Sequence, residues 1–271
     1  MKKWIKNSIN RLLAGISLCI VNRDYWLTVV SELENRKMLE NIEAKRKTIA
    51  ILKSDNKALT DKYLPLSTSQ ILQDIFVLDH FRYKQNGYFV EFGATNGLNL
   101  SNTYILEKYF KWNGILAEPA KNWHKELKQN RNCIIETDCV WSSTGESLQF
   151  IEAKSAELST ISNFKDNDIH SQVRIEKRKY QVPSISLMDL LKRHNAPKQI
   201  SYLSIDTEGS EFEILKNFEF SKYSIGVITC EHNYGANREK IKELLEFNGF
   251  TRVHDEVSQF DDWYVNLQWL R

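Results

Sequence analysis

Cysteine is scarce in this chain, and an apolar run long enough to span a membrane is absent. The four cysteines among 271 residues show no Cys-x-x-Cys spacing. This excludes a disulfide or zinc framework and indicates buried residues in a reducing compartment. The apolar run Leu12–Val21 is about half the length of a membrane span, and no small-residue cleavage site follows it as in a secretory signal. The sequence therefore predicts a cytoplasmic protein.

A large excess of charge of one sign is absent as well. The 37 Lys and Arg residues against 35 Asp and Glu residues give a net charge of +2, so nothing at whole-chain level indicates nucleic-acid binding. The charge is uneven, because residues 1–62 hold thirteen Lys and Arg but only seven Asp and Glu. We therefore expect a basic helical arm at residues 1–62 and a mildly acidic domain at residues 63–271.

Two helices are predicted in the arm. Residues 2–30, which include Trp4, repeat apolar residues at helical spacing with basic residues elsewhere on the wheel. Such a helix suits peripheral contact with the inner face of the membrane, or docking on the protein itself or on a second copy. Residues 31–63 place Ile42 and Ile49 on an imperfect heptad seam. This indicates either a homodimer coil or an intramolecular helix.

Beyond residue 70, apolar strand-like runs alternate with helical runs, which predicts a mostly parallel sheet of seven strands with helices on both faces. The predicted strands are Tyr88–Phe92, Gly114–Ala117, Cys133–Val140, Tyr202–Ile205, Ile225–Cys230, Thr251–His254 and Trp263–Val265. The predicted helices are Gln70–Tyr83, Ser101–Phe110, Trp123–Asn130, Ser186–His194, Glu211–Asn217 and Asn237–Phe247.

One segment, Glu152–Gln181, does not fit this alternation. It is polar and carries the basic cluster Arg174–Lys179. We interpret it as a long excursion over the ligand face that shapes the substrate pocket. The basic cluster is either a solvated face or a contact for an anionic substrate.

The first strand leads into the stretch "YFVEFGATNG", Tyr88–Gly97, which holds two of only ten glycines. In an open α/β sheet, ligands bind beyond the carboxyl ends of the strands. Gly93 and Gly97 would let the backbone approach a ligand closely. The pattern acidic-x-Gly-x-x-x-Gly lacks the third glycine of a dinucleotide loop and the lysine of a P-loop. This disfavours a nicotinamide dehydrogenase, but an ordinary strand-to-helix turn stays possible.

Acidic residues follow the next two strands. Glu118 ends "GILAEP" and suits the two hydroxyls of a ribose by analogy with the dinucleotide folds, and Asp138 suits an adenine amino group. Together with Glu91, these carboxylates would repel a pyrophosphate. They fit S-adenosylmethionine, a nucleoside with a sulfonium and no phosphate. The alternative is that all three cap helices.

The fourth predicted strand opens into "YLSIDTEGSEFEIL", with Asp206 and Glu208 at its carboxyl end. The fifth ends in "CEHN", which places Glu231 and His232 on the neighbouring strand tip. Parallel strands end at one edge of a sheet, so we expect acids and an imidazole to converge around one substrate group. Glu211 begins a helix and suits its dipole.

The segments "FVEFGATNG", "WNGILAEP", "YLSIDTEGSEFEIL" and "DDWYVN" together resemble the FkbM-type methyltransferase family over roughly residues 67–266. The Asp-x-Glu-Gly-x-Glu element is the most specific of these motifs. The resemblance implies a class I, Rossmann-like methyltransferase fold and S-adenosylmethionine as the methyl donor. It further implies transfer to a hydroxyl oxygen, often of a sugar or a polyketide-like product, in surface-glycan or natural-product pathways. By the same resemblance, the first cofactor loop is formed by Glu91, Gly93, Ala94, Asn96 and Gly97, while Glu118 holds the ribose and Asp206 lies beside the cofactor.

A hydroxyl acceptor benefits from a positioned base. We expect Asp206 or His232 to take the proton, with Glu208 as a further catalytic residue. His232 has the better unperturbed pKa, whereas Asp206 needs its pKa raised by burial or by the neighbouring carboxylates. An alternative is a divalent metal, Mg or Mn, bound by Asp206, Glu208, Glu231 and His232.

The alternative hypothesis is that the chain has this fold but is not an enzyme. It would then be an interaction protein whose helical arm binds a partner or a membrane. The cofactor loop and the full Asp-x-Glu-Gly-x-Glu element favour the enzyme.

Overall fold

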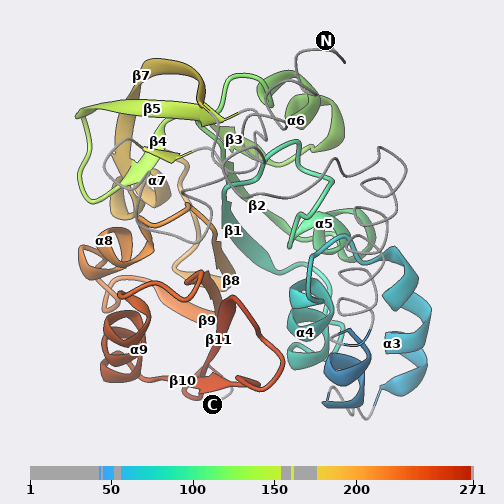
Figure 1. Cartoon of the computed structure of the whole chain (residues 1–271). Coiled ribbons are helices and arrows are strands. Elements are labelled where there is room, and N and C mark those ends of the chain that lie inside the picture. Colours follow the sequence, from blue (N-terminus) through green and yellow to red (C-terminus); the bar gives the residue numbers. More distant parts are fainter. Residues whose placement is uncertain (1–42, 44, 52–55, 154–159, 162–175, 270–271) are drawn as a thin grey trace, which may run out of the picture. The chain divides into compact units, whose positions relative to one another are not determined.

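The computed structural model of the chain (Figure 1) describes residues 43, 45–51, 56–153, 160–161 and 176–269. The chain divides into two compact units, Met1–Lys47 and Thr48–Arg271. The predicted helix of residues 2–30 and most of the predicted helix of residues 31–63 lie outside the described residues. The homodimer coil, the membrane contact and the boundary between residues 62 and 63 therefore stay predictions.

In the larger unit, helices and strands alternate along most of the chain. The helices are α3 (Lys57–Tyr63), the short 3-10 helix η1 (Leu64–Leu66), α4 (Gln73–His80), α5 (Tyr104–Phe110), α6 (His124–Asn130), α7 (Leu187–Arg193), α8 (Glu211–Lys216) and α9 (Arg238–Phe247). The strands are β1 (Tyr88–Phe92), β2 (Asn113–Ala117), β3 (Ile134–Glu136), β4 (Cys139–Trp141), β5 (Ser147–Ala153), β6 (Thr160–Ile161), β7 (Glu176–Ser186), β8 (Gln199–Ile205), β9 (Ser224–Glu231), β10 (Phe250–Val253) and β11 (Asp261–Asn266). Within the parts that the structure describes, no helix is both long enough and apolar enough to cross a membrane.

Seven strands form the main sheet, in the order β10-β11-β9-β8-β1-β2-β3. The strands from β9 to β3 run parallel to one another, and β11 runs antiparallel to both of its neighbours. The predicted Rossmann-like methyltransferase fold, with a mostly parallel seven-stranded sheet, is confirmed. The order changes direction at β1, whose neighbours are β8 and β2, so the sheet has the switch point at which α/β proteins bind ligands.

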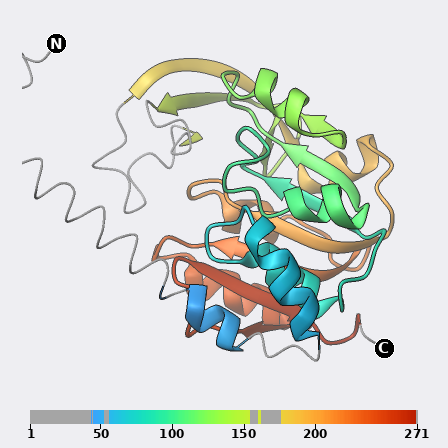
Figure 2. The same ribbon diagram turned by 90° about the vertical axis from the view of Figure 1, so that its right-hand side faces the viewer.

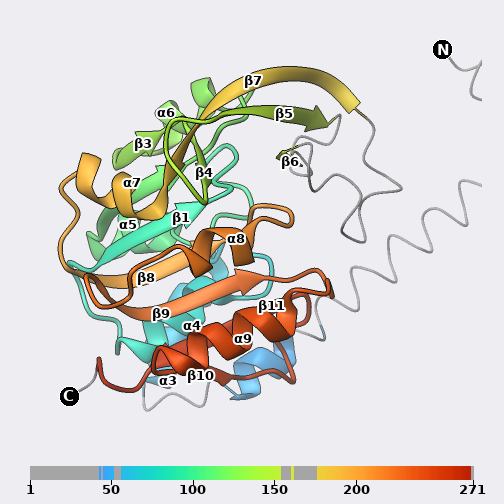
Figure 3. The ribbon, with the colours of Figure 1, turned by 90° about the vertical axis from the view of Figure 1, so that its left-hand side faces the viewer.

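Helices cover both faces of this sheet because the parallel strands are apolar on both sides. In β1, Phe89 belongs to one hydrophobic core, with residues of α4, α5 and α6, and the next residue, Val90, belongs to the other, with residues of α7, α8 and α9. Figure 2 turns the first of these faces toward the viewer, and Figure 3 turns the second. Alternate residues of one strand therefore build two cores around a fixed sheet.

The predicted single strand Cys133–Val140 is wrong. β3 ends at Glu136, and β4 begins at Cys139 and leaves the main sheet. It joins a second, four-stranded sheet with the order β4-β7-β5-β6, which we did not predict. The edges of the supposed excursion Glu152–Gln181 belong to the strands of this sheet (Figure 3), because apolar residues such as Phe150 and Val182 pack into a small third core.

Trp263 provides a test of the core that supports β9 and β11. Its side chain is fully buried and stacks on Phe76 of α4, with the ring centroids 4.6 Å apart. We expect Trp263→Ala to lower the free energy of unfolding by about 3–5 kcal/mol, as measured by urea unfolding. Phe247→Ala is the control, since Phe247 is 89% exposed, and it should change stability by less than about 0.5 kcal/mol. Equal effects of the two substitutions would contradict this account of the core.

Candidate functional site

The loops after β1, β8 and β9 carry strained backbone at the carboxyl edge of the sheet. Five residues other than glycine have positive φ angles there: Thr95 (46°), Leu100 (61°), Glu208 (57°), Asn233 (43°) and Tyr234 (56°). A left-handed conformation costs such residues roughly 1–2 kcal/mol each. Strain of this kind persists where the surrounding structure imposes it, commonly at functional sites.

Gly93 is the point at which the loop after β1 meets the end of β8. Its φ is +71°, and a Cβ atom built on it would lie 2.0 Å from the backbone oxygen of Asp206. At Gly97, with φ +74°, a Cβ atom would lie 2.5 Å from Leu127 and 2.7 Å from the Cγ atom of Arg131. We expected these glycines to admit a ligand. The structure gives another reason, because the space that each side chain would need is filled by the protein itself.

Glu91 holds the segment that follows the glycines. Its carboxylate is buried and accepts hydrogen bonds from the hydroxyl of Ser101, the backbone N–H of Asn102 and the hydroxyl of Thr103. Burial raises its pKa, against the lowering effect of the Arg131 charge and of these hydrogen bonds. The partners of Glu91 in the structure are therefore residues of its own loop.

The other predicted loop residues also turn inward. Ala94 is buried, and its N–H points to the carbonyl of Ala117 at 3.5 Å. The side-chain oxygen of Asn96 accepts from the N–H groups of Leu98 and Asn99. Both residues therefore make contacts within the protein that shape the loop.

Glu118 joins the loops after β1 and β2. One of its oxygens accepts from the N–H of Thr95 at 2.7 Å and the other from the N–H of Ala120 at 2.8 Å. Burial raises its pKa to about 7, and the charge of Asp206 adds to this rise. Glu118 therefore lies within electrostatic reach of Asp206, as the strand-end argument predicted.

Asp138 lies further along the same edge, after β3. Its carboxylate is 2.7 Å from the guanidinium of Arg193, which also contacts Glu136 at 2.8 Å. Asp138 thus has a cationic partner at the end of α7 that we did not foresee.

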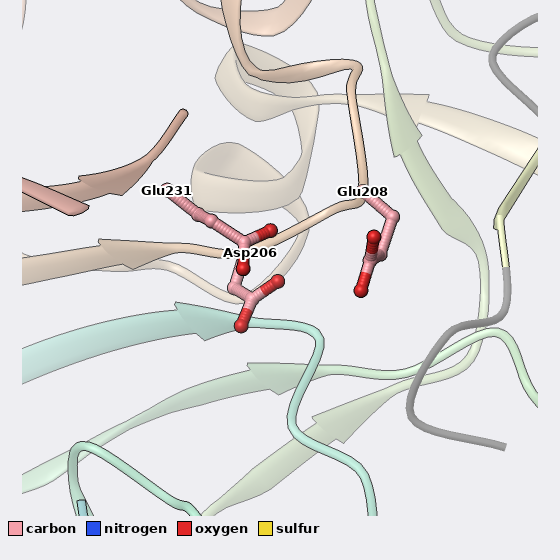
Figure 4. A group of neighbouring side chains, drawn as sticks. All are labelled: Asp206, Glu208 and Glu231. Carbon is pink, nitrogen blue, oxygen red and sulfur yellow. The ribbon is translucent and has the colours of Figure 1, made fainter. Parts of the chain in front are cut away.

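Three carboxylates converge at the tips of β8 and β9. Asp206, Glu208 and Glu231 each offer an oxygen, and these atoms lie within 4.8 Å of one another. Figure 4 shows this carboxylate cluster beside the end of β8. Burial raises the pKa of Glu231 well above its usual value, and the charges of Asp206 and Glu208 raise it further. One oxygen of Glu231 is buried without a hydrogen-bond partner.

Asp261 extends this acidic region, and we missed it because it lies on the antiparallel strand β11. It pairs with Glu231 across the sheet. Burial raises its pKa well above the usual range, and Asp206 contributes to the shift. The motif "DDWYVN" contains it, but no local pattern indicates which strand lies beside β9.

His232 lies apart from the carboxylate cluster. Its Nδ1 accepts the backbone N–H of Tyr234 at 3.0 Å, and its Nε2 faces Asp262 at 3.7 Å. The side chain is 2% exposed, and burial lowers its pKa. Three of the four predicted metal ligands therefore come together, and His232 does not join them.

Glu211 folds back onto the turn between β8 and α8. One of its oxygens accepts from the N–H groups of Thr207 and Gly209 and from the hydroxyl of Thr207. This agrees with its predicted role at the start of a helix, and it makes Glu211 a support for Glu208 and Gly209.

A cavity of about 310 Å³ adjoins the cluster on the side of α8 and α9. Glu231 lines it, together with His232 and the start of α9 at Arg238. The bidentate pair of Arg238 with Asp262 fixes this wall. The cavity therefore lies directly beside the carboxylate of Glu231.

The family model of the methyltransferase FkbM domain matches residues 91–268. No curated protein matches the chain. Among solved structures, the chain is similar to the methyltransferase FkbM from Methylobacillus flagellatus KT, with 13% identity and a TM-score of 0.45, over 85% of this chain and 60% of that one.

Two further similar structures have lower TM-scores. One is a precorrin-6y C5,15-methyltransferase from Geobacter metallireducens GS-15, with 12% identity and a TM-score of 0.35, over 66% of this chain and 71% of that one. The other is the human methyltransferase 10 domain containing protein, with 13% identity and a TM-score of 0.38, over 71% and 78%. These likenesses are too distant to inform the site. The chain spans about three fifths of the Methylobacillus protein.

Replacing Glu231 tests the carboxylate cluster. Because the pKa of Glu231 is raised in the folded protein, the folded state binds this proton more tightly than the unfolded state does. The free energy of unfolding therefore falls as the pH rises from the ordinary pKa toward the raised one. We expect Glu231→Gln, which cannot ionise, to lose less stability than the wild type as the pH rises above the ordinary glutamate pKa, as measured by urea unfolding.

The matched control is Glu239→Gln, since the Glu239 side chain is 69% exposed. This control should keep the pH profile of the wild type. A Glu231→Gln profile parallel to that of the wild type would contradict the raised pKa.

Proposed function

Since the chain belongs to the FkbM methyltransferase family and is a methyltransferase, we propose that it transfers a methyl group from S-adenosylmethionine to a hydroxyl oxygen of a sugar, glycan or related metabolite. The main support for this proposal is that the loop after β1, Glu118 and Asp206 lie close together at one edge of the sheet. A cytoplasmic site of action, with or without peripheral membrane contact, is part of the same proposal.

The residues at this edge fit the donor. A ribose offers two hydroxyls, and each oxygen of Glu118 has one backbone N–H partner and a further lone pair with which to accept another hydrogen bond. Asp138, held by Arg193, suits the adenine amino group. The acidic cluster at the strand tips favours a cationic sulfonium and disfavours a phosphate. We assign Gly93 and Gly97 the role of shaping the loop over which the donor lies.

The donor, when bound, supplies a methyl group on a positively charged sulfur that leaves with its electron pair. The protein then has to align the acceptor oxygen with that methyl carbon and remove one proton. The cavity beside Glu231 is the proposed place of the acceptor. In the product, the acceptor oxygen holds the methyl group and its former proton rests on a carboxylate.

The carboxylate cluster suits the role of base better than His232 does. Burial raises the pKa of Glu231 well above its usual value, and the charges of Asp206 and Glu208 raise it further, so Glu231 keeps its proton at a pH at which an ordinary glutamate is ionised. A protonated Glu231 leaves its neighbour Asp206 as the group that accepts the proton of the acceptor hydroxyl. In contrast, Nδ1 of His232 already accepts a backbone N–H. Its Nε2 is buried without a hydrogen-bond partner among the described residues and lies 3.7 Å from Asp262, outside the carboxylate cluster. We propose Asp206 as the base, with Glu231 and Glu208 tuning it.

A divalent cation, Mg or Mn, is the alternative use of the same cluster. Carboxylate oxygens suit these hard cations, and among the residues that the structure describes, Asp206, Glu208 and Glu231 are the group whose oxygens meet closely enough. Such a cation would lower the pKa of the acceptor hydroxyl.

Titration calorimetry tests the donor site. We expect S-adenosylmethionine to bind the wild type, and Glu118→Ala to weaken binding at least tenfold, about 1.4 kcal/mol, because the ribose hydroxyls lose their acceptor. The affinity should also fall below the Glu118 pKa of about 7, since a protonated carboxyl accepts fewer hydrogen bonds.

The control is Glu243→Ala, which removes an exposed carboxylate from α9 and should leave the affinity unchanged. If folded wild-type protein does not bind the donor, the enzyme proposal fails and the interaction protein is favoured. If Glu118→Ala binds normally, only the ribose assignment fails.

Transfer of labelled methyl groups tests the reaction. With methyl-labelled donor and a cell-envelope glycan fraction, we expect label in sugar ethers that survive mild base. Asp206→Asn should slow transfer by about 100-fold or more, because it removes the proposed base. Asp255→Asn is the matched control, since the Asp255 side chain is 63% exposed.

The same assay separates the two uses of the cluster. Full activity after dialysis against EDTA supports the carboxylate base, whereas loss that Mg or Mn restores supports the metal. Label found in protein or nucleic acid and absent from glycan would contradict the proposed acceptor class.

A further inference from the structure

Arg131 is a cation buried beneath the loop after β1, and neither the motif argument nor the proposed mechanism uses it. It directly follows α6, and its side chain is completely inaccessible to solvent. Burying a guanidinium is costly unless hydrogen bonds and charges surround it. The surroundings of this side chain therefore show what it has to hold.

The guanidinium donates to the middle and to the C-terminal end of the loop. Nη1 donates to the carbonyl of Gly97 and to the hydroxyl of Ser101, each at 3.1 Å. Nη2 donates to the hydroxyl of Thr103 at 2.8 Å. Three acceptors spread over seven residues of the loop are thus fixed by one planar group, a geometry that arginine provides and lysine does not.

The remaining nitrogen ties this group to α5. Nε donates to Glu107 at 2.6 Å. The guanidinium fork of Arg131 therefore makes two separate attachments. Its Nε side anchors Arg131 to α5, and its Nη1 and Nη2 side binds the loop.

The two hydroxyls link Arg131 to Glu91. Ser101 and Thr103 each accept from Arg131 and donate to the same oxygen of Glu91, and the direct separation of Arg131 from Glu91 is 3.7 Å. Donors and acceptors polarise one another in such a chain. Glu91 at the end of β1 and Arg131 thus hold the loop from its two sides.

The stem of Arg131 also sets the path of the backbone. A Cβ atom on Gly97 would lie 2.7 Å from its Cγ, so the loop at Gly97 is in contact with the buried side chain. Any shift of Arg131 would displace this part of the loop.

We infer that Arg131 is a positioning residue for the donor site, which fixes the loop of residues 93–103 in its binding shape without touching the ligand. The inference rests on the proposed function and adds a residue that the motifs of the family resemblance did not include. A buried ion pair that only stabilises the fold is the competing explanation. The two explanations predict different properties for a variant with lysine in place of Arg131.

Calorimetry with S-adenosylhomocysteine, together with thermal unfolding, separates these explanations. Arg131→Lys keeps the charge beside Glu91 and Glu107 but loses the fork. We expect it to weaken binding about tenfold or more, since hydrogen bonds of a charged group are lost from the loop, while it retains most of the stability that Arg131→Met loses. Thr103→Val, which removes one link between Arg131 and Glu91, should weaken binding in the same direction.

Glu107→Gln is the matched control, because it removes the negative charge beside Nε of Arg131 but keeps an oxygen that can accept from Nε, and it leaves the loop side of the guanidinium intact. It should lower the melting temperature and change the affinity by less than about twofold. If Arg131→Lys and Thr103→Val bind as the wild type does, Arg131 has only a structural role and the inference is overturned. If the wild type binds neither S-adenosylhomocysteine nor the methyl donor, the proposed function is wrong, and so is the inference that rests on it.

Discussion

The close approach of Gly93 to the backbone of Asp206 is the constraint on which the site depends. With no side chain at Gly93, the loop after β1 passes directly over the end of β8. This contact places Thr95 where it donates to Glu118, and it brings Glu118 within electrostatic reach of Asp206. Parallel strands end together, but they do not by themselves bring loops this close. The backbone strain and the raised pKa values at this edge are costs of stability that follow from gathering acids around one space.

Most of the fold follows from the sequence, because parallel strands that are buried on both faces leave unbroken apolar runs. These runs placed β1, β2, β8 and β9 within a few residues of their observed bounds. The run Cys133–Val140 misled because apolar residues stand on both sides of the polar residues 136–138, although the chain passes there from β3 in one sheet to β4 in another. The second sheet went unpredicted because its apolar residues, such as Phe150 and Val182, flank the polar segment Glu152–Gln181 on either side and no local pattern pairs them.

The residues of the candidate site that lie at strand ends could be predicted from the sequence. The residues whose positions depend on packing between distant segments of the chain could not. Asp206 and Glu118 could be placed at one edge from strand order alone. His232 follows Glu231 directly, yet it faces Asp262 on β11, a neighbour that no local pattern reveals. Arg131 directly follows α6, and only the folded chain shows that its side chain points inward to the loop.

The central claim is that the acidic edge of the sheet binds a nucleoside sulfonium through Glu118 and presents its methyl group to Asp206. A crystal structure of the protein with S-adenosylhomocysteine tests this claim most directly. The account predicts both ribose hydroxyls within hydrogen-bond distance of Glu118, and the sulfur on the side of the loop that faces the carboxylate cluster. A ligand bound elsewhere, or a ribose turned away from Glu118, would contradict it.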